Sequence, residues 1–565
     1  MTPETFFENF GHLADAPNGV EKLRELVLQM AVRGRLTESE PEEGTGRELH
    51  EKLLQEKQRL TKAKLMRRSK ALPEIKIDEK PFQIPKHWKF VRLNDVGEWG
   101  SGGTPLKTHQ EYYGGDIPWL VIGDLNGTIV HSAEKYITQA GLENSSAVLL
   151  EPNTLLIAMY GSIGKLGVTG ITCATNQAIA FCKPFAGIDL WFLFWLLREA
   201  RDRLTYRGKG LAQQNISQTV LKNFVIGLPP LEEQKRIVAK VDELMNHCDR
   251  LETAKASRTR VHAKLTGASL NALSTADSPQ TFGKSWRRVQ DNFAQLFDTP
   301  ESVQDLRQTI LQLAVQGKLV PQDPNDESAE VLLERIIRYK TDLIKAKVIP
   351  KTIATSKVSK DEQPFELPEF WLWCRWDQVS LQIGDVDHKM PSEVKEGIPY
   401  VSPRDFYGTN DINFDAAKKI SEADFERLSK KIQPRLGDLI FPRYGTIGEN
   451  RLVRTTRDFL ASYSCATVKR LPDCMVGKYI FYYSLSGVVK SEIERYKNKT
   501  TQANVGVKSI KNFIFPLPPL NDQKRIVAKV DSLMTLCDAL EAKLARKQGA
   551  AEALAAATVQ HMQAA

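Results

Sequence analysis

Residues 228–252 read LPPLEEQKRIVAKVDELMNHCDRLE, and residues 517–541 read LPPLNDQKRIVAKVDSLMTLCDALE. The two stretches are identical at 19 of their 25 positions. Each contains a pair of prolines, which cannot lie inside a helix and which fix an extended segment before it. We therefore expect a long helix to begin just after the prolines in both copies.

Apolar residues recur along each expected helix at alternating spacings of four and three. This spacing is that of the a and d positions of a heptad, which bury themselves against another helix. Each copy therefore predicts a helical seam. The expected seam residues are Ile237, Val241, Leu244, Cys248 and Leu251 in the first copy, and Ile526, Val530, Leu533, Cys537 and Leu540 in the second.

The repeat extends far beyond these helices. LRELVLQMAVRGRL at 23–36 matches LRQTILQLAVQGKL at 306–319, and the same offset of 283 pairs Trp88 with Trp371. Such self-similarity indicates two tandem halves of one plan. Between the matched ends of each half lies a long insert in which the two halves differ much more.

The inserts are rich in glycine, aromatic and β-branched residues, and they contain many turn signals such as IGDLNG at 122–127. This composition predicts short strands joined by tight turns. Despite their divergence, YGSIG at 160–164 corresponds to YGTIG at 444–448. The fold class predicted is α+β, with two tandem pseudo-symmetric halves, each a mixed, strand-rich domain followed by a long helix.

The same patterns place the domain boundaries. We expect a helical region and linker at 1–87, a first insert domain at 88–226, a first long helix at 227–272, a central connector and helical region at 273–370, a second insert domain at 371–515, and a second long helix with a C-terminal tail at 516–565.

The composition is that of a globular protein, with 42% hydrophobic and 26% charged residues. The apolar run LWFLFWLL at 190–197 is too short to cross a bilayer, and MTPETFFENF at the N-terminus lacks a signal-peptide pattern. A cytoplasmic location is expected. The net charge of +9 is compatible with nucleic acid as a partner.

Metal and disulfide chemistry is not indicated. The seven cysteines are odd in number and show no C-x-x-C pair, and the nine histidines show no H-E-x-x-H. We expect the cysteines to be small buried hydrophobic residues.

Catalytic motifs are not indicated either. GSIGK at 161–165 resembles a phosphate-binding loop, but Met159 and Leu166 break the Walker pattern and Glu449 replaces the lysine in the second half. There is no N-P-P-[YF] motif of amino-methyltransferases and no convincing nuclease set. The chain is expected to be non-catalytic, and YGSIG and YGTIG are expected to be tight turns between strands.

Basic and amide side chains gather at the end of each insert. Lysine and arginine neutralise phosphates, whereas glutamine, asparagine and arginine can read base edges. A polar loop leading into a strand is the alternative for any single residue, but recurrence in both halves favours a shared surface. The residues are Arg207, Lys209, Gln213, Gln214 and Asn215 in the first insert, and Lys497, Lys499, Gln502 and Asn504 in the second.

This pattern resembles the specificity (S) subunit of Type I restriction-modification enzymes. The resemblance covers essentially the whole chain and is carried by the two LPPL-x-x-QKRIVAKVD segments, the GGTP, YYGG and IPW motifs within 102–119, and the YG-[ST]-IG turns. In that family each insert is a target-recognition domain that reads one half of a split DNA site. The repeated helices there form an antiparallel coiled coil that holds the two domains apart.

The resemblance also implies partners and their cofactors. Double-stranded DNA, two methyltransferase subunits and the restriction subunits would bind this chain, partly through the helices at 21–36 and 304–319. S-adenosylmethionine, ATP and Mg²⁺ would be bound by the partner subunits and none by this chain. The complex would methylate adenine at N6 and cleave foreign DNA in an ATP-dependent reaction.

The residues expected to contact DNA lie in the shared motifs and at the ends of the inserts. The second insert departs from the family's pattern, because GGTP is absent and the stretch reads IGDVDHKMPSEVKEG at 383–397. The full set is Thr104, Lys107, Tyr160, Ser162, Lys165, Arg207, Lys209, Gln213, Gln214, Asn215, Lys389, Arg404, Arg443, Tyr444, Thr446, Lys497, Lys499, Gln502 and Asn504.

The expected helix length agrees with a split DNA target. A helix over 232–256 would span roughly 37 Å at 1.5 Å per residue, close to the ~34 Å of one DNA turn. Two unlike half-sites around an unread spacer are the implied target. The competing hypotheses are an enzyme that methylates or cleaves DNA alone, and a coiled-coil adaptor whose inserts bind protein.

Overall fold

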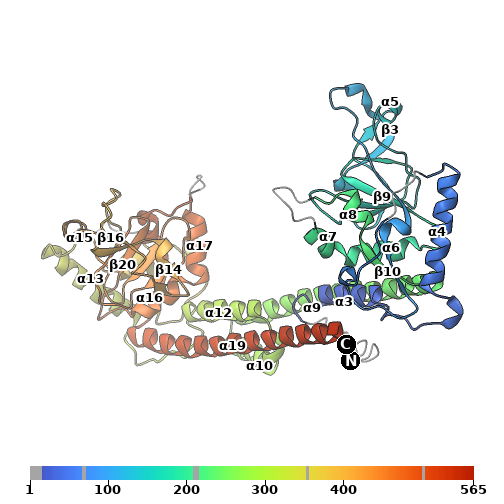
Figure 1. The fold of residues 1–565 in the computed structure, drawn as a ribbon. Coiled ribbons are helices and arrows are strands. Elements are labelled where there is room, and N and C mark those ends of the chain that lie inside the picture. Colours follow the sequence, from blue (N-terminus) through green and yellow to red (C-terminus); the bar gives the residue numbers. More distant parts are fainter. Residues whose placement is uncertain (1–15, 67–71, 208–214, 352–355, 499–502, 565) are drawn as a thin grey trace. The chain divides into compact units, whose positions relative to one another are not determined.

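A computed structural model of the chain describes residues 16–66, 72–207, 215–351, 356–498 and 503–564. The chain divides into two compact units (Figure 1). Unit 1 comprises residues 1–258 and 548–565, and unit 2 comprises residues 259–547. Each unit contains one insert domain together with helices from the matched regions on either side of it.

The first two α-helices described in unit 1 lie in the region 1–87, which was expected to be helical. Helix α3 (Gly19–Val32) buries Leu23 and Val27 and is followed by Gly34, whose φ of +67° allows the chain to reverse. Helix α4 (Gly46–Lys62) starts with a capping box in which the Thr45 hydroxyl accepts a hydrogen bond from the backbone N–H of Glu48. The glutamate side chain in turn accepts from the Thr45 N–H, so this helix start is fixed locally.

The insert domain of unit 1 consists of two sheets and several short helices. The five-stranded sheet has the order β2 (Gly97–Ser101), β9 (Ile179–Pro184), β6 (Leu155–Ala158), β7 (Leu166–Thr169) and β4 (Ile129–Val130). The three-stranded sheet has the order β5 (Tyr136–Ile137), β3 (Tyr113–Leu120) and β8 (Ala174–Thr175). The helices are α5 (Gln139–Glu143), α6 (Leu190–Glu199), α7 (Arg201–Arg207) and α8 (Gln218–Lys222).

A two-stranded ladder closes the base of this domain. Strand β1 (Lys89–Arg92) pairs antiparallel with β10 (Val225–Leu228), so the two ends of the insert meet. The long helix α9 (Leu231–Ser274) begins directly after the second of these strands and has 44 residues. It is therefore about 66 Å long at 1.5 Å per residue, and its bounds lie close to the 227–272 expected from the sequence.

Unit 2 repeats the plan with its own strands and helices. Its helical region contains α10 (Pro279–Asp291), α11 (Phe293–Leu296), α12 (Pro300–Val315) and α13 (Ala329–Lys345). Strand β11 (Leu372–Arg375) pairs antiparallel with β21 (Ile514–Leu517) and closes the domain as in unit 1. The second long helix α19 (Leu520–Ala564) follows and has 45 residues.

The insert domain of unit 2 has the corresponding sheets. One sheet has the order β12 (Gln382–Gly384), β20 (Cys465–Lys469), β17 (Leu439–Pro442) and β18 (Arg451–Leu452), and another has the order β16 (Lys418–Ile420), β13 (Ile398–Val401) and β19 (Leu460–Ala461). A hairpin joins β14 (Phe406–Tyr407) to β15 (Asp411–Ile412). The helices are α14 (Trp376–Val379), α15 (Glu422–Ser429), α16 (Gly477–Ser484), α17 (Gly487–Tyr496) and α18 (Val507–Asn512).

Seven of the ten predicted seam residues are buried, and Leu251, Leu533 and Leu540 are half-buried and pack against the same cores. In unit 1 the seam of α9 shares a hydrophobic core with α3 and with Ala555 of α19. In unit 2 the seam of α19 shares a core with α12, which lies alongside it (Figure 1), and with Leu270 and Leu273 of α9. The start of α9 thus lies in the same unit as the end of α19, and the end of α9 lies in the same unit as the start of α19, as an antiparallel pair requires.

Equivalent ion pairs fasten the frame helices to the long helices. Arg24 of α3 contacts Asp249 at 2.6 Å and Glu252 at 2.7 Å. In unit 2 Arg307 of α12 makes the matching contacts at 2.5 Å and 3.0 Å, to Asp538 and Glu541. Sequence reasoning found the apolar seam but not these charged contacts along its edge.

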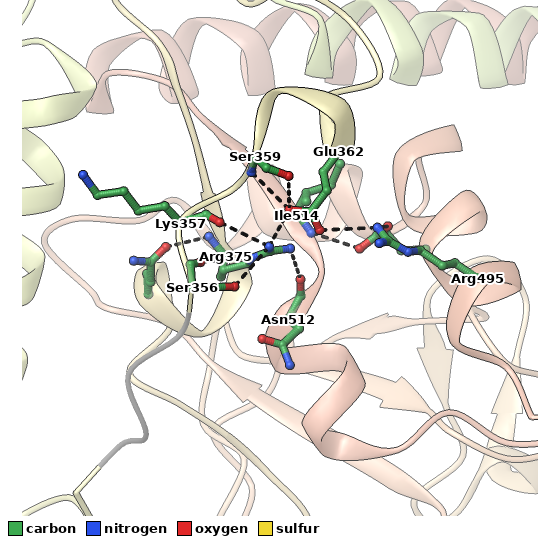
Figure 2. Close-up of polar contacts among 10 residues, drawn as sticks. Ser356, Lys357, Ser359, Glu362, Arg375, Arg495, Asn512 and Ile514 are labelled. Atoms are coloured by element: carbon green, nitrogen blue, oxygen red, sulfur yellow. Dashed lines mark hydrogen bonds and ion pairs between the residues drawn. The ribbon is translucent and has the colours of Figure 1, made fainter.

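A buried arginine ties the linker of each half to the base of its insert domain. In unit 2 Arg375 is 4% exposed and donates hydrogen bonds to the carbonyl oxygens of Ser356 at 3.2 Å and Asn512 at 3.0 Å (Figure 2). Its guanidinium also contacts the Glu362 carboxylate at 2.7 Å. The linker before the domain and the helix at its end are thereby held by one side chain.

The matching residue in unit 1 is Arg92, which is 3% exposed. It donates to the carbonyl oxygens of Pro73 at 3.1 Å and Asn223 at 2.9 Å and forms an ion pair with Glu79 at 3.2 Å. The repetition of the whole arrangement shows that both halves close their domains in the same way.

The Glu362 contact predicts a pH dependence of stability. Hydrogen bonds from Arg375 and from Ser359 lower the pKa of Glu362 to about 2, below its ordinary value of 4.5. Because the folded-state pKa is depressed, the stabilisation is complete above about pH 4.5 and is lost as the pH falls toward 2. We expect Glu362→Gln to lower the free energy of unfolding of the full chain at pH 7 by about 2 kcal/mol.

This difference should shrink as the pH is lowered from 5 to 3.5, measured by thermal unfolding of both proteins in matched buffers. Glu366→Gln, at an exposed position of the same segment, is the control and should show no such trend. An equal difference at pH 7 and pH 3.5 would contradict the assigned role of Glu362.

Candidate nucleic-acid interface

Each insert domain brings its YG-[ST]-IG turn together with its closing polar segment. The turn at 160–164 follows β6, and Tyr160 forms a backbone bridge with Asn215. The turn at 444–448 follows β17, and Tyr444 forms the same bridge with Asn504. In both units the turn therefore lies beside the described end of the polar segment, Asn215 or Asn504.

The first glycine of each turn has open space on the side where a side chain would lie. Gly161 has a φ of +63° and Gly445 a φ of +69°, which is the left-handed region that glycine adopts without strain. A Cβ atom built at either position would meet no atom within 4 Å. Glycine is therefore favoured at these positions by the backbone conformation and not by a lack of space. The prediction that both segments are tight turns between strands is confirmed.

The other side of each turn is anchored. A Cβ built on Gly164 would lie 2.8 Å from Cγ of Arg201 in α7, and one on Gly448 would lie 3.0 Å from Cδ1 of Ile493 in α17. The backbone N–H of Ile216 donates to Met159 at 2.9 Å, and that of Val505 donates to Arg443 at 3.1 Å. Each turn thus packs against a helix, α7 or α17, and is hydrogen-bonded to the segment that contains the backbone bridge. The first glycine of the turn remains accessible.

The predicted contact residues of unit 1 are mostly accessible. Tyr160 is 43% exposed, and Ser162, Asn215 and Lys107 are also exposed, whereas Thr104 is half-buried. Lys209, Gln213 and Gln214 lie outside the described residues, and Arg207 is described only as the last residue of α7.

Lys165 is half-buried and bonds within the domain. Its ammonium group donates to the carbonyl oxygens of Ile122 at 3.1 Å and Gly123 at 3.3 Å. The lysine therefore links the turn to the segment after β3, and its charge is partly engaged there.

Unit 2 also exposes most of its described candidates. Thr446, Arg404 and Lys389 are exposed, and Lys497 is exposed while pairing with Glu494 at 3.4 Å. Tyr444 is half-buried and packs edge-on against Tyr463, with ring centroids 6.3 Å apart, and Asn504 is half-buried. Lys499 and Gln502 lie outside the described residues.

Arg443 is placed differently from the prediction that it presents its charge to DNA. It is 5% exposed, it donates to the Val505 carbonyl at 3.0 Å, and it forms an ion pair with Asp385. The equivalent residue in unit 1 is the buried Met159. Burial of a charge is tolerated only with such partners, and because Asp385 is distant in sequence no local signal could have revealed the pair.

The cysteines behave as the sequence predicted. All seven are free and buried, and burial raises the pKa of Cys173 and of Cys465 to about 12. Within the described ranges no group of three or more His, Cys, Asp or Glu side chains could hold a metal ion. No helix in the described part of the chain has both the length and the apolar character needed to span a membrane.

Residues 85–258 and 381–547 match the family described as "Type I restriction modification DNA specificity domain". These two ranges cover more than half of the chain and fall one in each half. The chain therefore belongs to the family of specificity subunits of type I restriction-modification systems, and it carries two DNA-recognition domains of that family in tandem.

Two curated relatives match along nearly their whole length. The type I restriction enzyme EcoEI specificity subunit of Escherichia coli is 29% identical over 94% of this chain and 91% of its own. The EcoAI specificity subunit of Escherichia coli is 29% identical over 93% of this chain and 90% of its own.

A solved structure also matches. The HsdS subunit from Thermoanaerobacter tengcongensis matches 85% of this chain and 99% of its own, with 18% identity and a TM-score of 0.43.

The accessible turn predicts a sensitivity to small substitutions. Gly161→Ala places a methyl group in open space at a cost of about 1 kcal/mol in backbone strain. If this turn lies against DNA, we expect the assembled complex to lose about tenfold or more in affinity for its target. The measurement is a titration of labelled duplex at fixed salt, because phosphate contacts make such affinities salt-dependent.

Gly267→Ala is the matched control, since Gly267 in α9 also has no atom within 4 Å of a built Cβ. It should leave affinity unchanged. Equal affinities of the two variants would show that the turn at 160–164 does not face the duplex.

Proposed function

We propose that this chain is the non-catalytic sequence-recognition subunit of a type I restriction-modification complex, in which each insert domain reads one half of an asymmetric bipartite DNA target. The observation that carries the proposal is the repeated junction of an accessible glycine turn with a polar segment, Tyr160 with Asn215 and Tyr444 with Asn504. One backbone frame presents this junction in both units.

The two junctions carry unlike side chains, which supports unlike half-sites. Lys165, just after the first turn, corresponds to Glu449, just after the second, and the exposed Ser162 corresponds to the exposed Thr446. Since sequence is read by side chains in the grooves while backbone contacts only position the protein, two such surfaces would select different bases. Exposed candidates such as Ser162, Thr446 and Arg404 would make these contacts.

The long helices would set the spacer between the half-sites, and the frame helices would recruit the other subunits. Methyltransferase subunits would supply S-adenosylmethionine-dependent methylation of adenine at N6, and restriction subunits would supply ATP- and Mg²⁺-dependent translocation and cleavage. The chain itself would bind no cofactor and would act in the cytoplasm as part of a defence against foreign DNA.

Two other functions would give different results. An enzyme acting alone would methylate or cleave DNA as the purified chain. An adaptor whose inserts bind protein would show weak affinity for duplex DNA and little dependence of that affinity on salt.

The test is to co-express the chain with its methyltransferase partner in a host without other adenine methylation and to map modified adenines across the genome. We expect one bipartite motif with unlike halves. Exchanging residues 97–222 for the insert of a relative should change one half only. This exchange keeps β1, β10 and the contact of Arg92 with Asn223 intact.

The control for expression is a gene in which residues 97–222 keep their amino-acid sequence but are encoded by different codons. If the partner is bound and active but no motif appears, the insert domains do not read DNA in this complex. A change in both halves after the exchange would contradict the assignment of one half-site to each domain.

A further inference from the structure

One helix of each insert domain is tied to its long helix through a buried glutamine. Gln234 of α9 accepts a hydrogen bond at 2.8 Å from the backbone N–H of Asp189, which precedes α6. Gln523 of α19 accepts one at 2.9 Å from the backbone N–H of Val476, which precedes α16. Both glutamines are fully buried, so this first tie is part of the core of each unit.

A second tie lies near the surface, eight residues further along each long helix. The indole of Trp195 in α6 donates to the Asp242 carboxylate at 3.2 Å. In unit 2 the hydroxyl of Tyr482 in α16 donates to Asp531, and the Lys478 ammonium group lies 2.6 Å from the same carboxylate. Both aromatic donors are six residues beyond the first tie, so the arrangement is equivalent in the two units.

The ladders and the shared hydrophobic core hold the base of each domain on its long helix, and the two ties add two further fixed points along that face. Eight residues of helix span about 12 Å, so the glutamine and the aspartate hold two well-separated points along the face of the domain. Loss of the second tie would remove the outer of these two points and permit a small change in the tilt of the domain. Next to Asp531 a cleft of about 320 Å³, lined in part by Arg454 and Phe481, leaves room for such a movement.

We propose that Asp242 and Asp531 are positioning residues that fix the angle at which each recognition domain stands on its long helix, and that they thereby restrict the spacer length the complex accepts. This inference rests on the proposed function, because a spacer has meaning only for a bipartite target. In this proposal the two carboxylates do not contact bases. They act by orienting the recognition domain, which makes the base contacts.

The two ties differ in strength. Asp531 has a hydroxyl and an ammonium partner, whereas Asp242 accepts from the indole of Trp195. Two donors, one of them cationic, hold a carboxylate more firmly than one neutral donor does. Loss of the tie in unit 2 should therefore relax the spacer more than loss of the tie in unit 1.

The experiment uses the full chain co-expressed with its methyltransferase partner, and it maps methylated adenines for wild type, Tyr482→Phe, Asp531→Ala and Trp195→Phe. We expect methylation at sites with correct half-sites but a spacer one base pair too short or too long to rise about three- to tenfold, the range expected for loss of one hydrogen bond. The bases read in each half-site should stay the same.

Matched controls separate orientation from simple destabilisation. Tyr483→Phe removes a buried hydroxyl that donates to the Ile514 carbonyl inside the domain, and Trp191→Phe removes an indole that packs against Phe194. Both should leave spacer tolerance at the wild-type level even where they lower stability.

Unchanged spacer tolerance in Tyr482→Phe and Asp531→Ala would overturn the proposal, and so would an equal increase in Tyr483→Phe. A change in the bases read would show that Asp531 acts on the reading surface and not on orientation. If the wild-type complex yields no bipartite motif, the proposed function itself fails, and that result is seen before any variant is compared.

Discussion

The structure depends on a buried carboxylate in the first turn of each long helix. Glu233 and Asp522 are each 1% exposed, and a buried charge of this kind is costly unless it is paired. Each accepts a hydrogen bond from a tryptophan indole, at 3.1 Å from Trp88 and at 2.8 Å from Trp371. A negative charge is also favourable at a helix N-terminus. These contacts join the start of the long helix to the segment that enters the insert domain.

The base of each insert domain is therefore closed from several directions. The β1–β10 and β11–β21 ladders join its two ends, and a buried arginine, Arg92 or Arg375, ties the linker to the same place. The second helix of each half adds a lysine, since Lys57 and Lys340 donate to backbone carbonyl oxygens of the domain at 2.7 Å and 2.6 Å.

Much of this arrangement could be predicted from local patterns. The heptad spacing identified the buried faces of the long helices. The turns at 160–164 and 444–448 followed from their glycines, whose positive φ is a local requirement. Each of these features depends on residues that are near neighbours in the chain.

The sequence by itself determined the tandem repeat, the α+β class, the seams and the turns, because periodicity and backbone preference act over short distances. Only the tertiary structure decided that Arg443 pairs with Asp385 and is buried, and that Tyr160 lies beside Asn215. The same holds for the contact of Trp195 with Asp242. Such pairs join residues far apart in the chain, and whether a polar side chain is exposed or buried depends on the partners that folding brings to it.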